Sequence, residues 1–506
     1  MRRALICLLL VAAAVAALPA SVSVAQEEFR FFGSGFGHGL GMSQWGAYGL
    51  ARDGWGASRI LRHFYSGTQV RQTSNGPERL RIGLVQSRDS VRLQAQAGRV
   101  EIHLGTRNGD LVGTIPSGRS WRVRATADDY RIVDEDGNTV DRVGGPGTRI
   151  FAIFESIGSR VRVPEAGHTY NRGWIEFGLY SCGGQACDLR LVLSVDSEKY
   201  LYGLGEVPSS WPMAAMRAQA IAARTYAFTK ARASQHRPGC DCALYASSFD
   251  QVYAGWDKEN GLDGDRWVSA VNQTRDEVVM DGGSTIQAFY MSSSGGHTED
   301  NENVWGGTPI GYLRGVCDPG DYTTANPSAT WQVTLTAGRI TRSLGLGIGT
   351  VTGFAHATRG VSGRIMSVTV RGANGQASIS GTALRTSLGL RDDRVWINTD
   401  RLVTGAIRSK YDALGCSPGQ ARSRQVSVAG GLRQVFQRST IYFSNPTGAH
   451  ELSGPVLQHY RSRGGPGGNL GFPTSDSRTL PNGNRRASFE RGIITCRPDG
   501  SDCWVD

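Results

Sequence analysis

Long apolar runs are missing from the sequence after its first 25 residues, which argues against a membrane-spanning protein. The opening residues follow the order of a secretory signal peptide: two arginines, an apolar run from Ala4 to Leu18, and small residues ending at Ala25. A membrane anchor is the alternative, but a span needs about 20 apolar residues, and Pro19 interrupts the run. We therefore predict a signal peptide over residues 1–25, and a secreted chain without a membrane segment after cleavage.

Blocks of basic residues with aromatic residues between them are also absent, although the formal net charge is +11. Nucleic-acid binding would favour basic residues clustered on one stretch or face, whereas the arginines here are scattered. We therefore predict no nucleic-acid partner. A basic surface also suits anionic polymers of a cell envelope, and export favours that environment.

Cysteines are few, and their number fits an oxidising compartment. Nine are present, and removal of Cys7 with the signal peptide leaves an even number. We predict that Cys182 pairs with Cys187 and Cys496 with Cys503, because each pair is close in sequence and flanked by loop residues. The partners of the other four, Cys240, Cys242, Cys317 and Cys416, stay open. His236 with Cys240 and Cys242 resembles part of a zinc site, but disulfides are favoured, so we predict neither a metal nor a cofactor.

Two kinds of periodicity indicate an α+β fold. From Arg79 to Leu193, short runs alternate apolar and polar residues between Gly, Asp and Asn, as expected for antiparallel strands. From Ser209 to Ser234 the sequence is rich in Ala, Met, Arg and Gln, which favours a helix capped by Ser209 or Ser210 with Pro212 in its first turn. A second helix is expected over Asp265 to Val278.

The C-terminal part is organised differently. The stretch from Cys416 to Gly431 has the composition of a linker, and a weak repeat follows. "RQVFQRSTIY" from Arg433 to Tyr442 is echoed by "RASFERGIIT" from Arg486 to Thr495. We expect one small repeat unit and the first strand of a second, which need each other to bury a core.

The most informative stretch is "YLYGLGEVPSSWPMAAMRAQAIAARTYAF", from Tyr200 to Phe228. It places one carboxylate, Glu206, in a glycine-flanked loop before a helix. A lone acid there is most often a partner of the helix dipole. Nearby aromatic residues, including Tyr202 and Trp211, offer surfaces on which a sugar ring could stack.

This stretch resembles the signature of the SpoIID/LytB family. Further motifs follow in family order: "DQVYAGW" from Asp250, "FYMSSSGGHTEDNENVWGG" from Phe289, and "YLRGV" from Tyr312. SpoIID proteins are lytic transglycosylases of peptidoglycan, and the resemblance places the catalytic glutamate at Glu206. It also implies a substrate-binding cleft formed by Gln219, Arg224, Tyr226, Gln251, Tyr253, Tyr290, Ser292 and Ser294.

The order of one motif departs from the family pattern. "GFGHGLGMSQWGAYGLA", from Gly35 to Ala51, opens the mature chain, whereas its counterpart normally closes the domain. Since domain termini often lie close together, a circular permutation would still bring His38 and Gln44 to the cleft, and we predict both as substrate-binding residues. The family often has Cys before "QVY", where this sequence has Asp250, which weakens the case for an inherited metal site.

A single acid restricts the chemistry. Hydrolysing glycosidases usually need two carboxylates, but in a lytic transglycosylase the 6-hydroxyl of muramic acid attacks C1 and forms a 1,6-anhydro ring. Glu206 would protonate the leaving oxygen and then accept the proton of that hydroxyl. This role needs a raised pKa from burial, whereas a helix N-terminus would lower the pKa of Glu206, and the sequence leaves the outcome open.

The C-terminal segments "IYFSNPTGAH", "GPVLQHYRSRGG" and "NLGFPTSD", between Ile441 and Asp476, resemble the LGFP repeat of exported wall proteins. The predicted domains are a SpoIID-like domain at 26–400, a linker at 401–431 and an LGFP module at 432–506. We predict a secreted, wall-associated peptidoglycan lytic transglycosylase whose partners are glycan strands and the envelope. The alternative is a non-catalytic, LytB-like modifier of a wall amidase.

Overall fold

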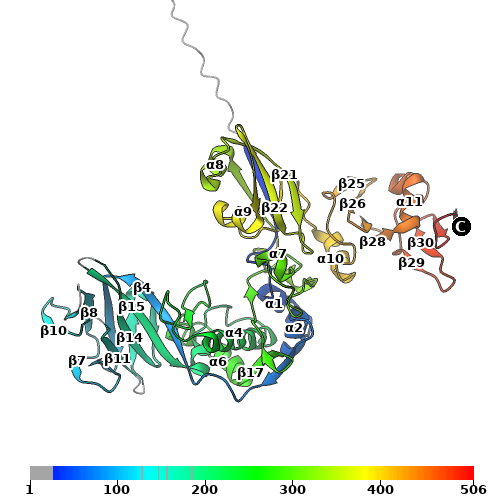
Figure 1. The fold of residues 1–506 in the computed structure, drawn as a ribbon. Helices are drawn as coiled ribbons and strands as arrows, with labels where there is room; N and C mark the ends of the chain where they lie inside the picture. Colours follow the sequence, from blue (N-terminus) through cyan, green and yellow to red (C-terminus); the bar gives the residue numbers. More distant parts are fainter. Residues whose placement is uncertain (1–26, 127–128, 146, 155–157, 184–185) are drawn as a thin grey trace, which may run out of the picture.

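The computed structural model describes residues 27–126, 129–145, 147–154, 158–183 and 186–506 (Figure 1). The predicted signal peptide lies outside these ranges. Among the described residues, no helix is both long and apolar enough to cross a membrane. Helices account for 23% of the chain and strands for 37%, which confirms the predicted α+β class.

The alternating segment after Arg79 forms two antiparallel sheets, as predicted, with one short parallel strand added. Buried and exposed residues alternate along the strands, so Val91 and Leu93 of one sheet and Ile175 and Phe177 of the other belong to one core. One sheet has the order β10-β9-β8-β5-β12-β13 and the other β16-β4-β15-β14-β11-β6-β7. The bounds are β4 (Arg79–Arg88), β5 (Ser90–Ala97), β6 (Val100–Leu104), β7 (Leu111–Ile115), β8 (Ser120–Ala125), β9 (Tyr130–Val133), β10 (Thr139–Val143), β11 (Arg149–Ile153), β12 (Arg160–Val163), β13 (His168–Tyr170), β14 (Trp174–Gly183), β15 (Ala186–Asp196) and β16 (Leu244–Tyr245).

Helices pack beside this pair of sheets. The predicted long helix is α4 (Met213–Ala233), whose many alanines are buried and allow close packing. Its N-cap is Pro212 without a side-chain hydrogen bond, so the prediction of a serine cap was wrong. The second predicted helix is α6 (Gly264–Gln273), which ends before Val278 because the chain continues into strand β17 (Glu277–Asp281). The shorter helices here are α3 (Ser197–Tyr202) and α5 (Trp256–Glu259).

The N-terminal motif is an integral part of this first core. Its strand β2 (Met42–Ser43) pairs in parallel with β19 (Tyr290–Met291), more than 240 residues later in the chain. Helices α1 (Gln44–Arg52) and α2 (Ala57–Phe64) both pack against α4. Strand β3 (Gln69–Gln72) then pairs with β17, which also pairs with β18 (Ser284–Thr285).

A second hydrophobic core lies within the range predicted as one domain, 26–400. Strand β1 (Glu28–Gly33) lies between β20 (Trp331–Thr336) and β24 (Val395–Ile397). Phe29 and Phe31 of β1 pack with residues such as Ile340, Val370 and Leu384 in a cluster separate from the first core. The remaining elements are β21 (Val351–Arg359), β22 (Ile365–Gly372), β23 (Gly375–Ser380), α8 (Ala337–Leu344) and α9 (Gly381–Leu388), and Figure 1 shows them together above α1 and α2.

The range 401–431, predicted as a linker, is folded in its central and last parts. It contains α10 (Gly405–Ala413) and β25 (Val426–Val428), and Ile407 of α10 shares a hydrophobic cluster with Phe436 and Ile441. The two predicted repeat segments form two similar hairpins, β26–β27 and β30–β31. The bounds are β26 (Gly431–Val435), β27 (Ser439–Ser444), β28 (Gly448–Ser453), α11 (Gly454–Ser462), β29 (Arg478–Thr479), β30 (Arg485–Phe489), β31 (Gly492–Cys496) and β32 (Cys503–Val505).

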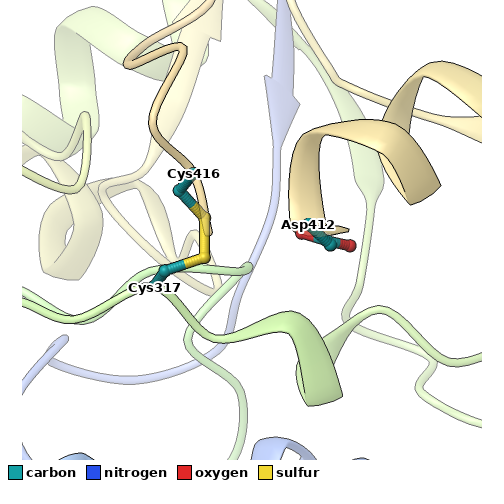
Figure 2. A group of neighbouring side chains, drawn as sticks. All are labelled: Cys317, Asp412 and Cys416. Carbon is teal, nitrogen blue, oxygen red and sulfur yellow. A yellow bond between two sulfur atoms is a disulfide. The ribbon is translucent and has the colours of Figure 1, made fainter. Parts of the chain in front are cut away.

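Disulfides account for every cysteine whose side chain is described. The predicted Cys496–Cys503 bond is present, and Cys187 is disulfide-bonded, although the side chain of Cys182 lies outside the described part. Cys240 pairs with Cys242, so these sulfurs do not form the considered zinc site with His236, which instead contacts Asp241. Cys317 pairs with Cys416 beside Asp412 (Figure 2). This disulfide links the chain at Cys317 to the turn after α10, in the cluster that contains Ile407.

Candidate active site

A cleft of about 460 Å³ opens between the N-terminal motif, the loop before α4, the strand β19 and helix α7 (Asn301–Trp305). Six residues predicted for the site line it: His38, Gln44, Glu206, Tyr226, Tyr290 and Ser292. Their roles toward a substrate stay predictions, but the fold brings them together from segments that are far apart in sequence.

Glu206 lies in the loop between α3 and α4, which is held against the chain from Gln251 to Ala254. Leu204 forms a β-bridge with Tyr253, and the backbone N–H of Gly205 donates to the carbonyl of Val252 over 2.9 Å. The backbone N–H of Val252 in turn donates to Oε1 of Glu206 over 2.6 Å. The backbone thus fixes one oxygen of the carboxyl directly.

The second carboxyl oxygen of Glu206 is reached by the N-terminal motif. Nε2 of Gln44, the first residue of α1, donates to Oε2 of Glu206 over 3.3 Å. The pairing of β2 with β19 places the start of α1 next to Tyr290. The displaced motif thus contributes directly to the surroundings of the glutamate.

Two glycines of this motif permit the close packing. Gly39 has φ +90° and lies against the side chain of Arg364, where an added Cβ would stand 2.7 Å from Nε. Gly41 has φ +69°, and its Cβ would stand 2.0 Å from the carbonyl oxygen of Phe289. Any side chain at either position would be both strained and obstructed.

Tyr290 supplies a third hydrogen bond to Glu206, and Gln251 in turn holds Tyr290 in place. Its hydroxyl accepts from Nε2 of Gln251 over 2.9 Å and donates to the glutamate. Gln251 is fully buried, and its Oε1 accepts from the hydroxyl of Tyr200 over 3.0 Å. Burial and the neighbouring carboxylate raise the pKa of Tyr290 well above its usual value, so it stays a neutral donor.

Burial raises the pKa of Glu206 above its usual value of 4.5, and the hydrogen bonds from Val252, Gln44 and Tyr290 oppose this without reversing it. All three donors are uncharged. Helix α4 begins only at Met213, and among the described residues no N–H of its first turn contacts the carboxyl. The sequence left open whether burial or the helix N-terminus dominates the pKa of Glu206. In the structure, burial dominates.

Asp250 is a second carboxylate in the cleft lining, which the sequence analysis noted only as a replacement for Cys. Its Oδ2 accepts from Nη1 of Arg237 over 2.5 Å and from the backbone of Tyr245. Its Oδ1 accepts from the hydroxyl of Tyr226 over 3.0 Å and lies 3.6 Å from Nζ of Lys230. With a side chain only 1% exposed and two cationic partners, it is held as an ion-paired carboxylate.

His38 lies in the cleft as a neutral ring. Burial, together with the charges of Arg385 and Arg364, lowers the pKa of His38 to about 4. Its Nδ1 accepts from the backbone N–H of Leu40 over 3.1 Å, so the proton of the neutral ring lies on Nε2. The ring stands 5.2 Å from that of Trp305, centroid to centroid. Its contacts position the loop and the cleft wall.

Exposed aromatic side chains surround the cleft, and the sequence analysis did not select them. Phe36, Phe249 and Trp305 line it and are 50%, 70% and 52% exposed. Each of the three lies in or next to a quoted motif. An aromatic residue at such a position was therefore the signal in the sequence that could have selected them. Arg385 of α9 also lines the cleft and donates to the carbonyl of Gly37.

The other predicted substrate-binding residues lie behind the lining. Arg224 is fully buried and forms a bidentate ion pair with Glu198, and Tyr253 is stacked against Tyr200. Oγ of Ser294 donates to Asp318 over 2.6 Å. Gln219 is buried in α4, and Gln251 acts through Tyr290. The structure therefore places these five as supporting residues, because their side chains are enclosed by the core.

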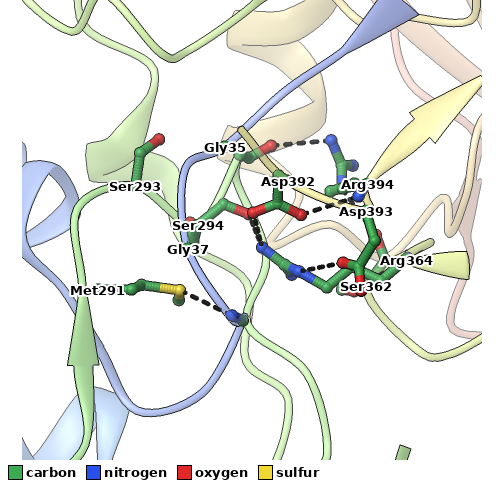
Figure 3. A network of polar contacts seen from close by, with 12 residues as sticks. Gly35, Gly37, Met291, Ser293, Ser294, Ser362, Arg364, Asp392, Asp393 and Arg394 are labelled. Carbon is green, nitrogen blue, oxygen red and sulfur yellow. Dashed lines mark hydrogen bonds and ion pairs between the residues drawn. The ribbon is translucent and has the colours of Figure 1, made fainter. Parts of the chain in front are cut away.

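A buried polar network joins the second core to the floor of the site (Figure 3). Nη2 of Arg364 donates to Oδ2 of Asp392 over 3.0 Å and to the carbonyl of Ser294 over 2.9 Å. The backbone N–H of Gly39 donates to the sulfur of Met291 over 3.1 Å. The loop of the N-terminal motif is thereby fixed between the two cores.

Comparison with known proteins identifies two segments. Residues 185–280 match the SpoIID family, described as stage II sporulation protein, and residues 420–468 match the LGFP repeat. The chain therefore carries a SpoIID-family domain followed by an LGFP repeat, as the motifs indicated.

Individual relatives cover parts of the chain. It is 34% identical to the amidase enhancer of Bacillus subtilis over 142 residues, which are 28% of this chain and 17% of that protein. An uncharacterised protein of Brachyspira hyodysenteriae is 35% identical over 25% of this chain and 33% of its own length. Stage II sporulation protein D of Bacillus subtilis is 26% identical over 45% of this chain and 67% of that protein. The chain thus spans a third or less of the first two relatives. Together these proteins support a role related to the cell wall.

Proposed function

We propose that this chain is a secreted, wall-associated lytic transglycosylase that cleaves peptidoglycan glycan strands. The observation that carries the proposal is the contrast within the cleft: Glu206 has uncharged donors and a raised pKa, whereas Asp250 is committed to Arg237 and Lys230. One carboxyl is thus suited to exchange a proton, and the other is committed to ion pairs.

The chemistry needs no second acid and no water. The protonated carboxyl of Glu206 donates its proton to the glycosidic oxygen while the bond from that oxygen to C1 breaks. The resulting carboxylate accepts the proton of the muramic acid 6-hydroxyl as its oxygen bonds to C1, so the 1,6-anhydro ring forms and Glu206 regains its proton. Tyr290 and Gln44 hold the carboxyl throughout.

The walls of the cleft suit a polysaccharide. Phe36, Phe249 and Trp305 present apolar ring faces to solvent around Glu206, and sugar rings pack on such faces. The LGFP repeat at 420–468 would attach the enzyme to the envelope, in keeping with the predicted export.

A second candidate function is favoured by the similarity to the amidase enhancer: non-catalytic modification of a wall amidase. Both candidates predict more wall degradation when an amidase is present, so that observation alone does not distinguish them. They differ in their effect on peptide-free glycan strands. Such strands are prepared with an amidase, which is then separated from them.

The test uses such strands, incubated with the full chain or with Glu206→Gln, and follows chain length by size-exclusion chromatography. Shortening by the wild-type protein and not by the variant supports the enzyme. Intact strands with both proteins, together with faster release of peptides by added amidase, would contradict the enzyme and support the modifier.

A further inference from the structure

Two adjoining clefts lie away from Glu206, where the second core meets α10 and the hairpin β26–β27. Their volumes are about 560 Å³ and 310 Å³, and they share Arg359 and Gln420 as lining residues. The linings combine β21, the chain around Arg394 and the start of the segment that matches the LGFP repeat. We call the two together the junction cleft.

Arginines dominate the charge of the junction cleft. Five line it, and no aspartate or glutamate among the described residues does so: the arginines are Arg359, Arg394, Arg401, Arg422 and Arg438. None of the five has a carboxylate partner within ion-pair distance in the described part of the chain. The neighbouring acids Asp392 and Asp393 instead contact Arg364.

The innermost arginines are held by neutral groups of the fold. Nη2 of Arg359 donates to the carbonyl of Val395 over 2.8 Å, and Nη1 of Arg394 donates to the carbonyl of Gly295 over 2.9 Å. These bonds orient the guanidinium groups but supply no opposite charge. Burial, together with the charges of Arg394 and Arg401, lowers the pKa of Arg359 to about 10, so it is still cationic at neutral pH.

A third cleft shows that this arrangement is not a general property of the surface. It has a volume of about 220 Å³, beside β11 and β14, and is also rich in arginine. There Arg149 contacts both Glu176 and Asp241, so the charges are internally balanced. The described lining of the junction cleft holds no such carboxylate, so an external anion could take that place.

We propose that the junction cleft binds an anionic polymer with repeated oxyanion groups, phosphodiester or carboxylate, of the kind that a cell envelope contains. Guanidinium groups pair with such oxyanions in a bidentate manner. A polymer is favoured over a single small ion because the arginines are spread over two connected clefts. The site lies outside the lining of the Glu206 cleft, so it would hold the enzyme on the wall without taking part in glycan cleavage.

The experiment compares the full chain with a variant in which the three peripheral arginines are neutralised, R401Q/R422Q/R438Q. These side chains are exposed or half-buried, so the fold should survive, which a thermal melt would verify. The matched control is R52Q/R342Q/R478Q, which changes the net charge equally at exposed positions outside the junction cleft. Binding is measured by calorimetry with sodium polyphosphate and poly-L-glutamate as probes.

We expect the wild-type chain and the control to bind one or both of these polymers, more weakly as salt is added. The junction variant should lose roughly tenfold or more in affinity. Preference for polyphosphate would assign phosphodiester groups, and preference for poly-L-glutamate would assign carboxylates. Equal affinities of the two variants for both polymers, or no binding of either polymer by the wild-type chain, would overturn the proposal. This experiment does not measure glycan cleavage, so it tests the junction cleft independently of the lytic activity.

Discussion

Glu206 and Asp250 line the same cleft, yet they are surrounded in opposite ways. Glu206 meets only uncharged donors, from Val252, Gln44 and Tyr290, and burial raises its pKa. Asp250 is the more enclosed of the two, but Arg237 and Lys230 compensate its charge. The difference shows that partner charge, not burial alone, separates a proton-exchanging carboxyl from a structural one.

The largest effect is expected from Glu206→Gln. The amide keeps the size of the side chain and can still accept from Val252, but it can neither donate nor recover a proton. General acid–base assistance is typically worth about 10²- to 10⁴-fold, so cleavage of peptide-free glycan should fall by at least a factor of about 100. A rate assay on defined strands measures this, and a sedimentation assay should show that the variant still binds glycan.

Asp250→Asn should reduce stability more than activity, the reverse of Glu206→Gln. It leaves Arg237 and Lys230 without a counter-charge, and removing one partner of a buried pair costs about 3–5 kcal/mol. We expect a smaller loss than this, about 2–3 kcal/mol, because the side chain of Arg237 is 26% exposed. Denaturant unfolding measures the loss. Activity per folded molecule should fall less than in Glu206→Gln, and a larger fall would make Asp250 a catalytic residue.

Tyr290→Phe tests whether the hydroxyl of Tyr290 lowers the pKa of Glu206. The hydroxyl hydrogen bond lowers the pKa of Glu206, so its removal should raise that pKa further, and the protonated acid should persist to higher pH. The alkaline limb of the pH–rate profile should therefore move upward, with a rate loss of roughly threefold to tenfold. The matched control is Tyr202→Phe, which removes a hydroxyl that donates to Asn272 instead. An unmoved or lowered limb would refute the assigned role of Tyr290.

The smallest effect concerns stability. A carboxyl whose pKa is raised by folding favours the folded state fully below its unfolded pKa near 4.5, and this contribution is lost as the pH rises through the folded value. Glu206→Gln should therefore be more stable than wild type at pH 7, by about 0.5–2 kcal/mol. The advantage should shrink toward pH 4. Thermal melts of both proteins across this pH range measure the difference in stability. An advantage of Glu206→Gln that grows toward pH 4 would mean that folding lowers the pKa of Glu206.

Much of the fold follows from local patterns. Alternation after Arg79 predicted the sheets, and the alanine-rich stretch before Ser234 predicted α4, because both depend on residues near in sequence. The second core was missed because it needs β1 from the chain start between β20 and β24, and strand partners so far apart leave no local pattern. The folded part of the predicted linker was missed since its apolar residues, such as Ile407, are sparse and pack on β27.

The site could be predicted only as far as the motifs reach. Glu206, Gln44 and Tyr290, selected from the motifs, line one cleft in the structure, and their catalytic and binding roles stay predictions. Arg224 and Ser294 share those motifs but face the interior, and a sequence motif does not distinguish a lining residue from one that supports it. Arg385 lies on an element that no quoted motif includes, so only the fold, which brings Arg385 to the carbonyl of Gly37, reveals it.

The central claim is that one acid acts without a water nucleophile, and the identity of the products tests it most directly. Purified glycan is cleaved by the wild-type chain in ¹⁸O-labelled water, and the new ends are analysed by mass spectrometry. Attack by the 6-hydroxyl predicts 1,6-anhydromuramic ends that carry no label and lack one water relative to hydrolytic ends. Labelled reducing ends would contradict the account, because they would require an activated water and a second base in the cleft.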